Sequence, residues 1–194
     1  MLISNKRNFI FVHVPKVAGT SVRKVLSPFC KVTNYGKQKH ASAASIREMF
    51  PKEFADYYTF AIVRNPWDWE VSAYFYIRQA SFHVYHDEVM TIDFKEYIKR
   101  RHMGKYDVMP HNLAWWVTDA NGKLIVDGLF FFEDLKSTYA ALRKRLKMPE
   151  LELQHHNRTR HQPYWTYYDD EAERRVAEVH RQDIKLFDYT FRSK

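Results

Sequence analysis

Short apolar runs alternate along the chain with segments in which apolar residues recur at helical spacing. The runs at residues 9–14 and 59–63 are rich in β-branched and aromatic residues, so each predicts a buried strand. A third run at residues 124–132 predicts further strand with a break near Gly128, and residues 133–146 have the pattern of a helix. This alternation predicts an α/β fold with a central, mostly parallel sheet and helices on both of its faces.

The turn after the first predicted strand has the composition of an anion-binding site. Apolar residues at positions 22, 25 and 26 predict a helix directly after this turn. The N-terminus of a helix carries partial positive charge and leaves backbone N–H groups unpaired. The turn adds an ammonium group, a glycine and two hydroxyls, supplied by Lys16, Gly19, Thr20 and Ser21. A phosphate or sulfate group suits this combination.

The order of residues in this turn differs from that of nucleotide triphosphatases. Their loop reads G-x-x-x-x-G-K-[ST], with the lysine directly before the hydroxyl that holds magnesium. Here Lys16 comes three residues before Gly19, and the second predicted strand is followed by Arg64 rather than by a metal-binding aspartate. The pattern therefore predicts a ligand with anionic groups at two places, held by Lys16 and Arg64, with no metal required.

A helix is predicted to begin directly after Arg64. Asn65 is a typical N-cap residue, and Pro66 suits the first helical turn. Ser72 lies six residues beyond Pro66, which is about 9 Å along the helix axis. A second phosphate alongside this helix could therefore contact both Arg64 and the hydroxyl of Ser72.

These two motifs resemble those of the sulfotransferases that use 3'-phosphoadenosine 5'-phosphosulfate (PAPS). The segment from His13 to Ser21 is similar to the family's 5'-phosphosulfate loop, and the segment from Val63 to Tyr74 is similar to its 3'-phosphate segment. Within the family, the chain resembles the carbohydrate branch that includes the heparan and chondroitin sulfate 2-O-sulfotransferases. The resemblance assigns cofactor binding to Pro15, Lys16, Val17, Ala18, Gly19, Thr20, Ser21, Arg64 and Ser72.

The resemblance also carries expectations about fold and chemistry. It implies a three-layer sandwich with a central, mostly parallel sheet, which is the P-loop-NTPase-like sulfotransferase fold. It implies PAPS as cofactor, adenosine 3',5'-bisphosphate as product, and no metal. The expected acceptor is a hydroxyl group on a glycan or glycoconjugate.

A third similarity, weaker than the first two, begins at Asn157. In relatives a basic loop here closes over the cofactor, which adds Asn157 and Arg158 to the expected cofactor-binding residues. Two positions depart from the family pattern. Val17 stands where many members have a hydroxyl residue, which implies a modest loss of cofactor affinity. Trp69 stands where several animal members have arginine, so the 3'-phosphate lacks one cation unless an arginine of the later loop supplies it.

His40 is the predicted general base. Transfer to a hydroxyl needs a group with a pKa near neutrality that removes the proton, and histidine is suited to that role. In the 2-O-sulfotransferase branch a histidine between the two cofactor motifs serves as the base, and His40 lies between them. The chain has ten histidines, and a single one is more often a surface or packing residue, so this assignment depends on the resemblance. Lys16 is expected to stabilise negative charge on the departing phosphate.

Length and composition indicate one globular domain. The chain has 194 residues and a hydrophobic content of 45%, so we expect a single sulfotransferase domain over residues 1–194. The single cysteine, Cys30, fits a reducing compartment. No apolar run reaches the length of a membrane span, and the first predicted strand begins close to the N-terminus. The expectation is a soluble, bacterial-type, cytoplasmic enzyme without a membrane anchor.

The net charge of +8 at pH 7 suits a polyanionic cofactor and an acidic acceptor. The densest basic clusters, at residues 99–101 and 143–147, lie at predicted helix ends where cations suit the helix dipole. We therefore interpret them as solvated and expect no nucleic-acid partner. Two alternatives stay open. One is a nucleotide-dependent phosphotransferase, which the missing G-K-[ST] disfavours, and the other is a non-catalytic basic domain that binds an anion or glycan.

Overall fold

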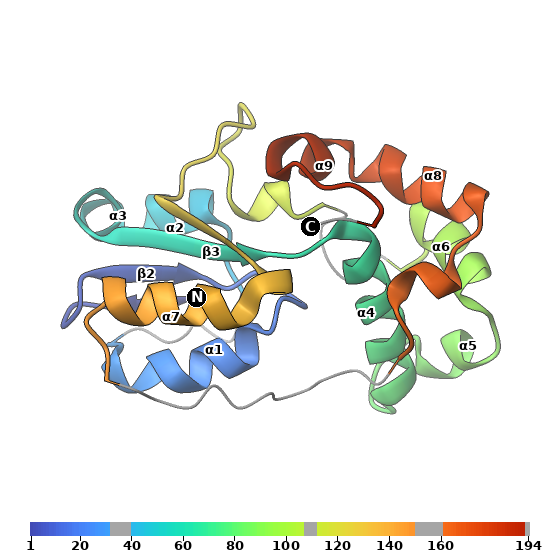
Figure 1. Ribbon diagram of the computed structural model, residues 1–194, viewed down its shortest axis with the longest axis horizontal. Helices are drawn as coiled ribbons and strands as arrows, with labels where there is room; N and C mark the ends of the chain where they lie inside the picture. The colour runs from blue at the N-terminus through green and yellow to red at the C-terminus, as the bar shows by residue number, and fades with distance from the viewer. Residues whose placement is uncertain (32–39, 107–111, 150–160, 193–194) are drawn as a thin grey trace. The chain divides into compact units, whose positions relative to one another are not determined.

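The computed structural model describes residues 1–31, 40–106, 112–149 and 161–192. The chain forms two compact units, and Figure 1 shows that the sheet belongs to the first of them. The first unit consists of Met1–Arg64 and Ala114–Asn157, and the second of Asn65–Leu113 and Arg158–Lys194. The single sulfotransferase domain over residues 1–194 stays a prediction.

The first unit is built on a sheet that has four strands in the described residues, in the order β1-β2-β3-β4. These strands are β1 (Leu2–Ser4), β2 (Phe9–Val12), β3 (Tyr58–Val63) and β4 (Gly128–Phe131). Strands β1 and β2 pair antiparallel, whereas the β2–β3 and β3–β4 pairs are parallel. The prediction of a mostly parallel sheet in an α/β fold is therefore confirmed. Strand β1 was not predicted, and it precedes the strand that the sequence places first.

Both faces of the two central strands are covered. All residues of β2 are buried, and so are the last five residues of β3. Successive side chains of a strand point to opposite faces, so such continuous burial means that neither face is open to solvent. On one face the ring of Phe60 lies 5.9 Å from that of Phe9 and 5.3 Å from that of Phe11, measured between centroids. The three-layer arrangement itself stays a prediction.

The described helices of the first unit are α1 (Gly19–Leu26), α2 (Ala43–Met49), α3 (Pro51–Asp56) and α7 (Leu135–Arg145), with short 3-10 turns η1 (Ser27–Phe29), η2 (Ala114–Trp116) and η3 (Phe132–Asp134). Two of these helices, α1 and α7, lie where the sequence predicts them. The apolar face of α1 buries Val22, Val25 and Leu26, as their spacing predicts. Ser42 caps α2 because its hydroxyl accepts a hydrogen bond from the backbone N–H of Ser45.

The third predicted strand is shorter than expected. Residues 124–127 lie outside it, and β4 begins at Gly128, where the sequence indicated a break. A Cβ atom at Gly128 would lie 2.0 Å from the hydroxyl oxygen of Tyr58. The side chain of Tyr58 therefore fills the space beside this glycine and would have to move to admit a larger residue.

The second unit is helical in the residues described. Its elements are α4 (Pro66–Gln79), α5 (His86–Met90), α6 (Phe94–His102), η4 (Tyr164–Tyr167), α8 (Asp170–Val179) and α9 (Arg181–Phe187). The predicted start of α4 is confirmed, because the side chain of Asn65 accepts hydrogen bonds from the N–H groups of Trp67 and Asp68. In the described part of the chain, no helix has the length and apolar character that crossing a membrane requires.

A buried ionic network holds α4, α6 and α9 of the second unit together. Glu70 of α4 forms an ion pair with Arg101 of α6, with 2.7 Å between Oε2 and Nε, and both side chains are fully buried. Oε1 of Glu70 lies 3.0 Å from Nε2 of His180, whose Nδ1 lies 2.6 Å from a carboxylate oxygen of Asp183. Burial alone would raise the pKa of Glu70, but Arg101, His102 and His180 together hold it well below its usual range.

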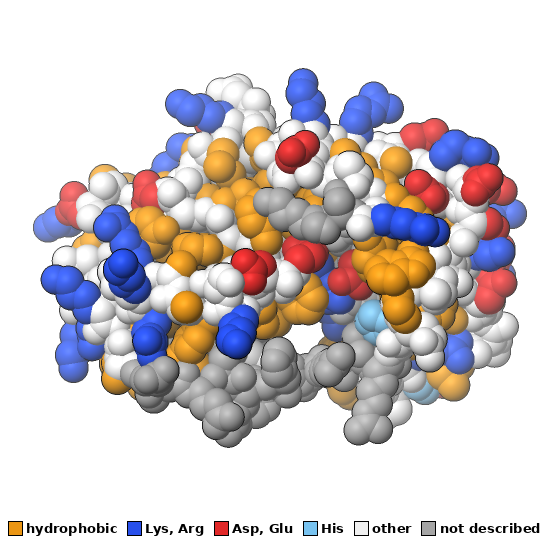
Figure 2. Space-filling view, in the orientation of Figure 1, with side chains coloured by type: hydrophobic (Ala, Val, Ile, Leu, Met, Phe, Trp, Pro, Cys, Tyr) orange, Lys and Arg blue, Asp and Glu red, His pale blue; other side chains and the backbone are white. Residues whose placement is uncertain are grey.

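The basic clusters are only partly solvated. Lys144 and Arg145 at the end of α7 are exposed, and Figure 2 shows Lys and Arg side chains standing singly among other residue types on the face that carries α7. This arrangement agrees with the interpretation of solvated helix ends. Arg101 contradicts it, because its side chain is 1% exposed and pairs with Glu70. A cation at a helix end becomes buried when a carboxylate of a neighbouring helix neutralises it.

Candidate active site

The turn between β2 and α1 has a backbone shape suited to an anion. Lys16 and Ala18 both have left-handed backbone angles, with φ of 63° and 58°. Such turns direct backbone N–H groups toward a common point. The N–H groups of Val17, Ala18, Gly19 and Thr20 have no hydrogen-bond partner among the residues that the structure describes. The turn therefore offers several unused donors at the positive end of α1.

His13 and Gly19 fix the inner wall of this turn. A Cβ atom at Gly19 would lie 1.9 Å from Nε2 of His13. The imidazole thus occupies the space that any other residue at position 19 would fill, and it is itself 5% exposed. The glycine predicted as part of the loop is required by this contact. This close-packed wall fits a group that approaches the backbone directly, such as a phosphate or a sulfuryl group.

Two cations meet at the same turn. The guanidinium of Arg64 donates a hydrogen bond to the backbone oxygen of Lys16 over 3.1 Å and lies above the ring of Phe132, 4.0 Å from its centroid. Arg64 is 6% exposed. Burial first, and then the charge of Arg64, lower the pKa of Lys16 to about 7. A bound anion would oppose both effects and favour the protonated lysine.

His40 lies against the strand that leads into the turn. Its Nδ1 lies 2.7 Å from the backbone oxygen of His13, and the two imidazole rings pack with their centroids 4.3 Å apart. A carbonyl oxygen only accepts hydrogen bonds, so Nδ1 of His40 carries the hydrogen. In the neutral ring Nε2 is then the unprotonated nitrogen, which is the form that a general base requires.

Aromatic side chains continue the wall beside His40. The ring of Trp116 lies edge-on, 6.0 Å from that of His40, and the ring of Trp115 lies 5.0 Å from that of Trp116. Trp116 is buried, whereas Trp115 is 48% exposed. The two indole rings thus form a continuous aromatic surface from the imidazole of His40 to the solvent-exposed Trp115.

The structure brings together most of the predicted cofactor residues of the first unit. Pro15, Val17, Gly19 and Ser21 are buried at the turn, and the side chain of Thr20 is exposed. Val17 is fully buried, so its side chain contributes to packing at a position where relatives carry a hydroxyl. Ser72 belongs to α4 of the second unit and is 3% exposed. Its joint contact with Arg64 on one phosphate stays a prediction.

Two predicted site residues have no described position, and two contacts of the site were not predicted. Asn157 and Arg158 lie outside the described residues. Sequence reasoning missed the contact of His13 with Gly19 and the packing of Phe132 beneath Arg64. His13 directly precedes the loop at the end of a strand, and that position was the only signal that could have indicated its role.

Comparison with known proteins agrees with this geometry. The protein has an α/β fold, and the turn between β2 and α1 has a backbone shape suited to an anion. A sequence model of the sulfotransferase family matches residues 1–190, and the chain therefore belongs to the sulfotransferase family. An uncharacterized protein from Archaeoglobus fulgidus is 30% identical over 100 residues, which cover 51% of this chain and 75% of that one. No solved structure matches the chain.

Proposed function

We propose that the protein transfers a sulfuryl group from PAPS to a hydroxyl group of a carbohydrate acceptor. The observation that carries this proposal is the placement of Lys16 and Arg64 together at a turn with unused backbone donors. A polyanion with phosphate and sulfate groups is the ligand such a turn favours. Membership of the sulfotransferase family supports the same chemistry.

The residues present suit PAPS. Lys16 and the backbone of residues 17–21 would hold its 5'-phosphosulfate, and Arg64 with Ser72 would hold its 3'-phosphate. When bound, PAPS supplies the sulfuryl group and the bisphosphate leaving group. The 3'-phosphate is what distinguishes this cofactor from ATP, and the sequence lacks the G-K-[ST] that a magnesium-dependent loop requires.

Lys16 would stabilise the negative charge that grows on the leaving phosphate. Lys16 is half-buried and its ammonium lies near a second cation, in surroundings where electrostatic interactions are stronger than in water. Binding of an anion raises the fraction of protonated Lys16, so the charge is present when the transfer needs it.

His40 would remove the proton from the acceptor hydroxyl. The carbonyl of His13 keeps the hydrogen of His40 on Nδ1, so in the neutral ring Nε2 carries the lone pair that would accept that proton. The indole rings of Trp115 and Trp116 would form a wall on which the apolar face of a sugar ring packs. The resemblance to the 2-O-sulfotransferase branch supports both the histidine base and the carbohydrate acceptor.

Binding of adenosine 3',5'-bisphosphate tests the cofactor assignment. Calorimetric titration of the wild-type protein without metal is expected to show binding of the bisphosphate at least about 10-fold tighter than that of 5'-AMP, since one additional charge-assisted contact is worth about 1.5–3 kcal/mol. Arg64→Ala should remove most of this preference. Arg47→Ala changes an exposed arginine of α2 and should leave it unchanged.

Two results of this titration would contradict the proposal. Equal, weak binding of both nucleotides would indicate a generic anion-binding domain. Binding of ATP that requires magnesium and exceeds binding of the bisphosphate would favour a phosphotransferase.

His40→Asn is expected to lower the transfer rate by about 10²–10⁴-fold, the usual contribution of a general base. Asparagine keeps a side-chain donor for the carbonyl of His13 but has no basic nitrogen. The rate is measured as transfer of labelled sulfate from PAPS to the best acceptor in a panel of saccharides. The affinity for the bisphosphate should stay the same, and a variant that loses affinity but keeps its rate would assign His40 to cofactor binding.

A further inference from the structure

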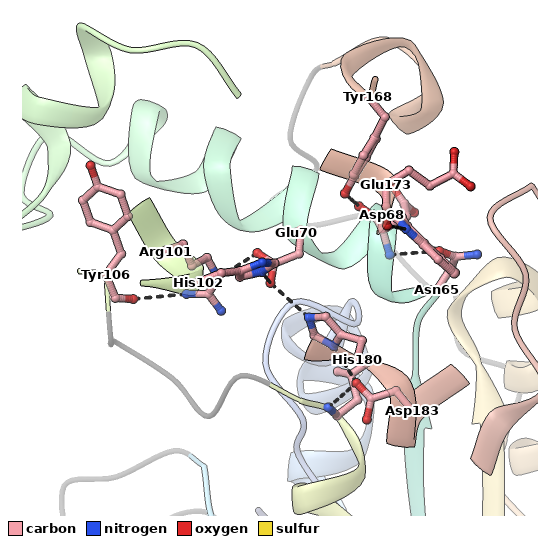
Figure 3. A network of polar contacts seen from close by, with 12 residues as sticks. Asn65, Asp68, Glu70, Arg101, His102, Tyr106, Tyr168, Glu173, His180 and Asp183 are labelled. Carbon is pink, nitrogen blue, oxygen red and sulfur yellow. Dashed lines mark hydrogen bonds and ion pairs between the residues drawn. The ribbon is translucent and has the colours of Figure 1, made fainter. Parts of the chain in front are cut away.

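The second unit contains a cluster of side chains that the proposed sulfuryl transfer does not use. Glu70, His102 and His180 each offer one ligand atom, and these atoms lie within 4.8 Å of one another. Figure 3 shows His180 placed between Glu70 on one side and Asp183 on the other. The three residues come from α4, α6 and the start of α9, so the cluster lies where these helices meet.

Two of the three separations between the ligand atoms are close to those around a tetrahedral metal ion. Oε1 of Glu70 lies 3.0 Å from Nε2 of His180 and 3.6 Å from Nε2 of His102. In a tetrahedral zinc site with nitrogen and oxygen ligands at about 2.0–2.1 Å from the metal, neighbouring ligand atoms are about 3.3 Å apart. The observed separations lie on either side of that value.

Asp183 gives His180 the orientation of a metal ligand. Its carboxylate accepts a hydrogen bond from Nδ1 of His180 over 2.6 Å and a second one from the backbone N–H of Leu113 over 2.8 Å. A carboxylate bound to the far nitrogen is the usual partner of a metal-bound histidine, because it fixes the ring and directs Nε2 at the metal. Asp183 itself is fully buried and held in place by the backbone.

His102 has a buried imidazole whose contact with Glu70, at 3.6 Å, is longer than a hydrogen bond. Its side chain is 6% exposed, and neither ring nitrogen forms a hydrogen bond among the described residues. Leaving buried polar atoms without a partner costs free energy. A metal ion at Oε1 of Glu70 would give Nε2 of His102 a ligand bond and would remove this cost.

Arg101 pairs with the carboxylate oxygen of Glu70 that the histidines do not contact. Its Nε pairs with Oε2 of Glu70, and Oε1 is the oxygen that faces both histidines. Glu70 and Asp183 carry two negative charges, and Arg101 carries one positive charge. The net charge of these three side chains is therefore negative, which favours the binding of one more cation. A divalent metal ion at Oε1 of Glu70 would supply that positive charge.

We propose that Glu70, His102 and His180 bind one divalent transition-metal ion of the zinc type, with Asp183 orienting His180 and a water molecule as the fourth ligand. Carboxylate and imidazole donors suit Zn²⁺ and Co²⁺. Such an ion would connect α4, α6 and α9, so it would stabilise the second unit and take no part in sulfuryl transfer.

Metal binding to the full-length protein tests this inference without any assay of transfer. The purified protein is stripped with a chelator and titrated with Co²⁺, and its visible absorption is followed. Saturation at one Co²⁺ per chain with the spectrum of a four-coordinate site is expected, as is one retained Zn²⁺ per chain after dialysis, measured by mass spectrometry. Asp183→Asn should weaken Co²⁺ binding by about 10–100-fold, and His102→Gln should weaken it further.

His83→Gln is the matched control, since His83 belongs to the same unit but lies outside the cluster, and it should bind Co²⁺ like the wild type. Circular dichroism verifies that each variant is folded. A wild-type protein that retains no stoichiometric metal overturns the inference even if every variant unfolds. Binding that persists unchanged in folded His102→Gln overturns it as well, because the metal then does not use His102 as a ligand.

Discussion

Lys16→Met is expected to lower the rate of sulfuryl transfer by about 10²–10³-fold, the loss seen when one preorganised donor to a developing charge is removed. Methionine keeps an unbranched side chain of similar length without the ammonium. The KM for PAPS should change far less than kcat, because the charge that Lys16 would stabilise develops on the leaving phosphate during the transfer. Steady-state kinetics with a saccharide acceptor measures both constants.

The pH dependence of bisphosphate binding provides the control for this role. Burial and Arg64 place the pKa of Lys16 at about 7, so its cationic form predominates below that pH and is lost above it. The affinity of the wild type for adenosine 3',5'-bisphosphate should therefore fall between pH 6 and pH 8. Lys16→Arg keeps its charge throughout this range and reports only the ionisation of the ligand. Equal pH profiles for the two proteins would mean that Lys16 keeps its charge over this range. Equal losses in kcat and affinity in Lys16→Met would make Lys16 a uniform binding contact.

The elements that flank the turn between β2 and α1 could be predicted because their signals are local. The run at residues 9–14 and the helical spacing of Val22, Val25 and Leu26 each require only neighbouring residues to be interpreted. The cap of α4 by Asn65 is local as well. These signals fixed β2, α1, β3 and the start of α4, and with them the place of the turn.

Strand β1 could not be predicted for the opposite reason. It has three residues, Leu2–Ser4, and it exists through its antiparallel pairing with β2, in which Leu2 faces Phe11 and Ser4 faces Phe9. A segment this short has too few residues to show the alternation typical of a strand. Only the presence of the neighbouring strand distinguishes it from a flexible terminus.

The order of the motifs predicts which residues form the candidate site, but it does not predict the contacts that hold them. Lys16, Gly19 and Arg64 follow from motif order, whereas the hydrogen bond from His40 to the carbonyl of His13 connects residues 27 positions apart. Nothing in the local pattern around His40 indicates this contact. Only the resemblance to the sulfotransferases indicated His40, and its contact with the carbonyl of His13 shows which nitrogen carries the hydrogen.

The buried ionic network escaped sequence analysis because its members look like surface residues. Glu70 follows a helix start, where acids are common, and Arg101 belongs to a basic helix end. Their burial arises because α4 is covered on several sides, and His180 reaches Glu70 from 110 positions away. Charge patterning along a single helix cannot reveal a partner on another helix.

Arg101→Met is expected to reduce the free energy of unfolding by about 3–5 kcal/mol, the cost of leaving one member of a buried ion pair without its partner. Arg101 also donates a hydrogen bond to the backbone oxygen of Tyr106 and lies 5.3 Å from the ring centroid of Trp69. Urea unfolding followed by tryptophan fluorescence, with a chelator present so that bound metal does not contribute, measures the change. Arg100→Met removes the neighbouring arginine, which is 32% exposed and pairs with Glu88 and Glu96, and should have a much smaller effect.

A double-mutant cycle with Glu70→Gln separates the ion pair from the other contacts of Arg101. Glutamine removes the charge that Arg101 neutralises and keeps an oxygen near Nε2 of His180. In the Glu70→Gln background no buried carboxylate remains uncompensated at this position, so Arg101→Met should then cost several-fold less than in the wild type. Additive losses would mean that Arg101 stabilises the second unit through Tyr106 and Trp69 and that its ion pair with Glu70 contributes nothing measurable.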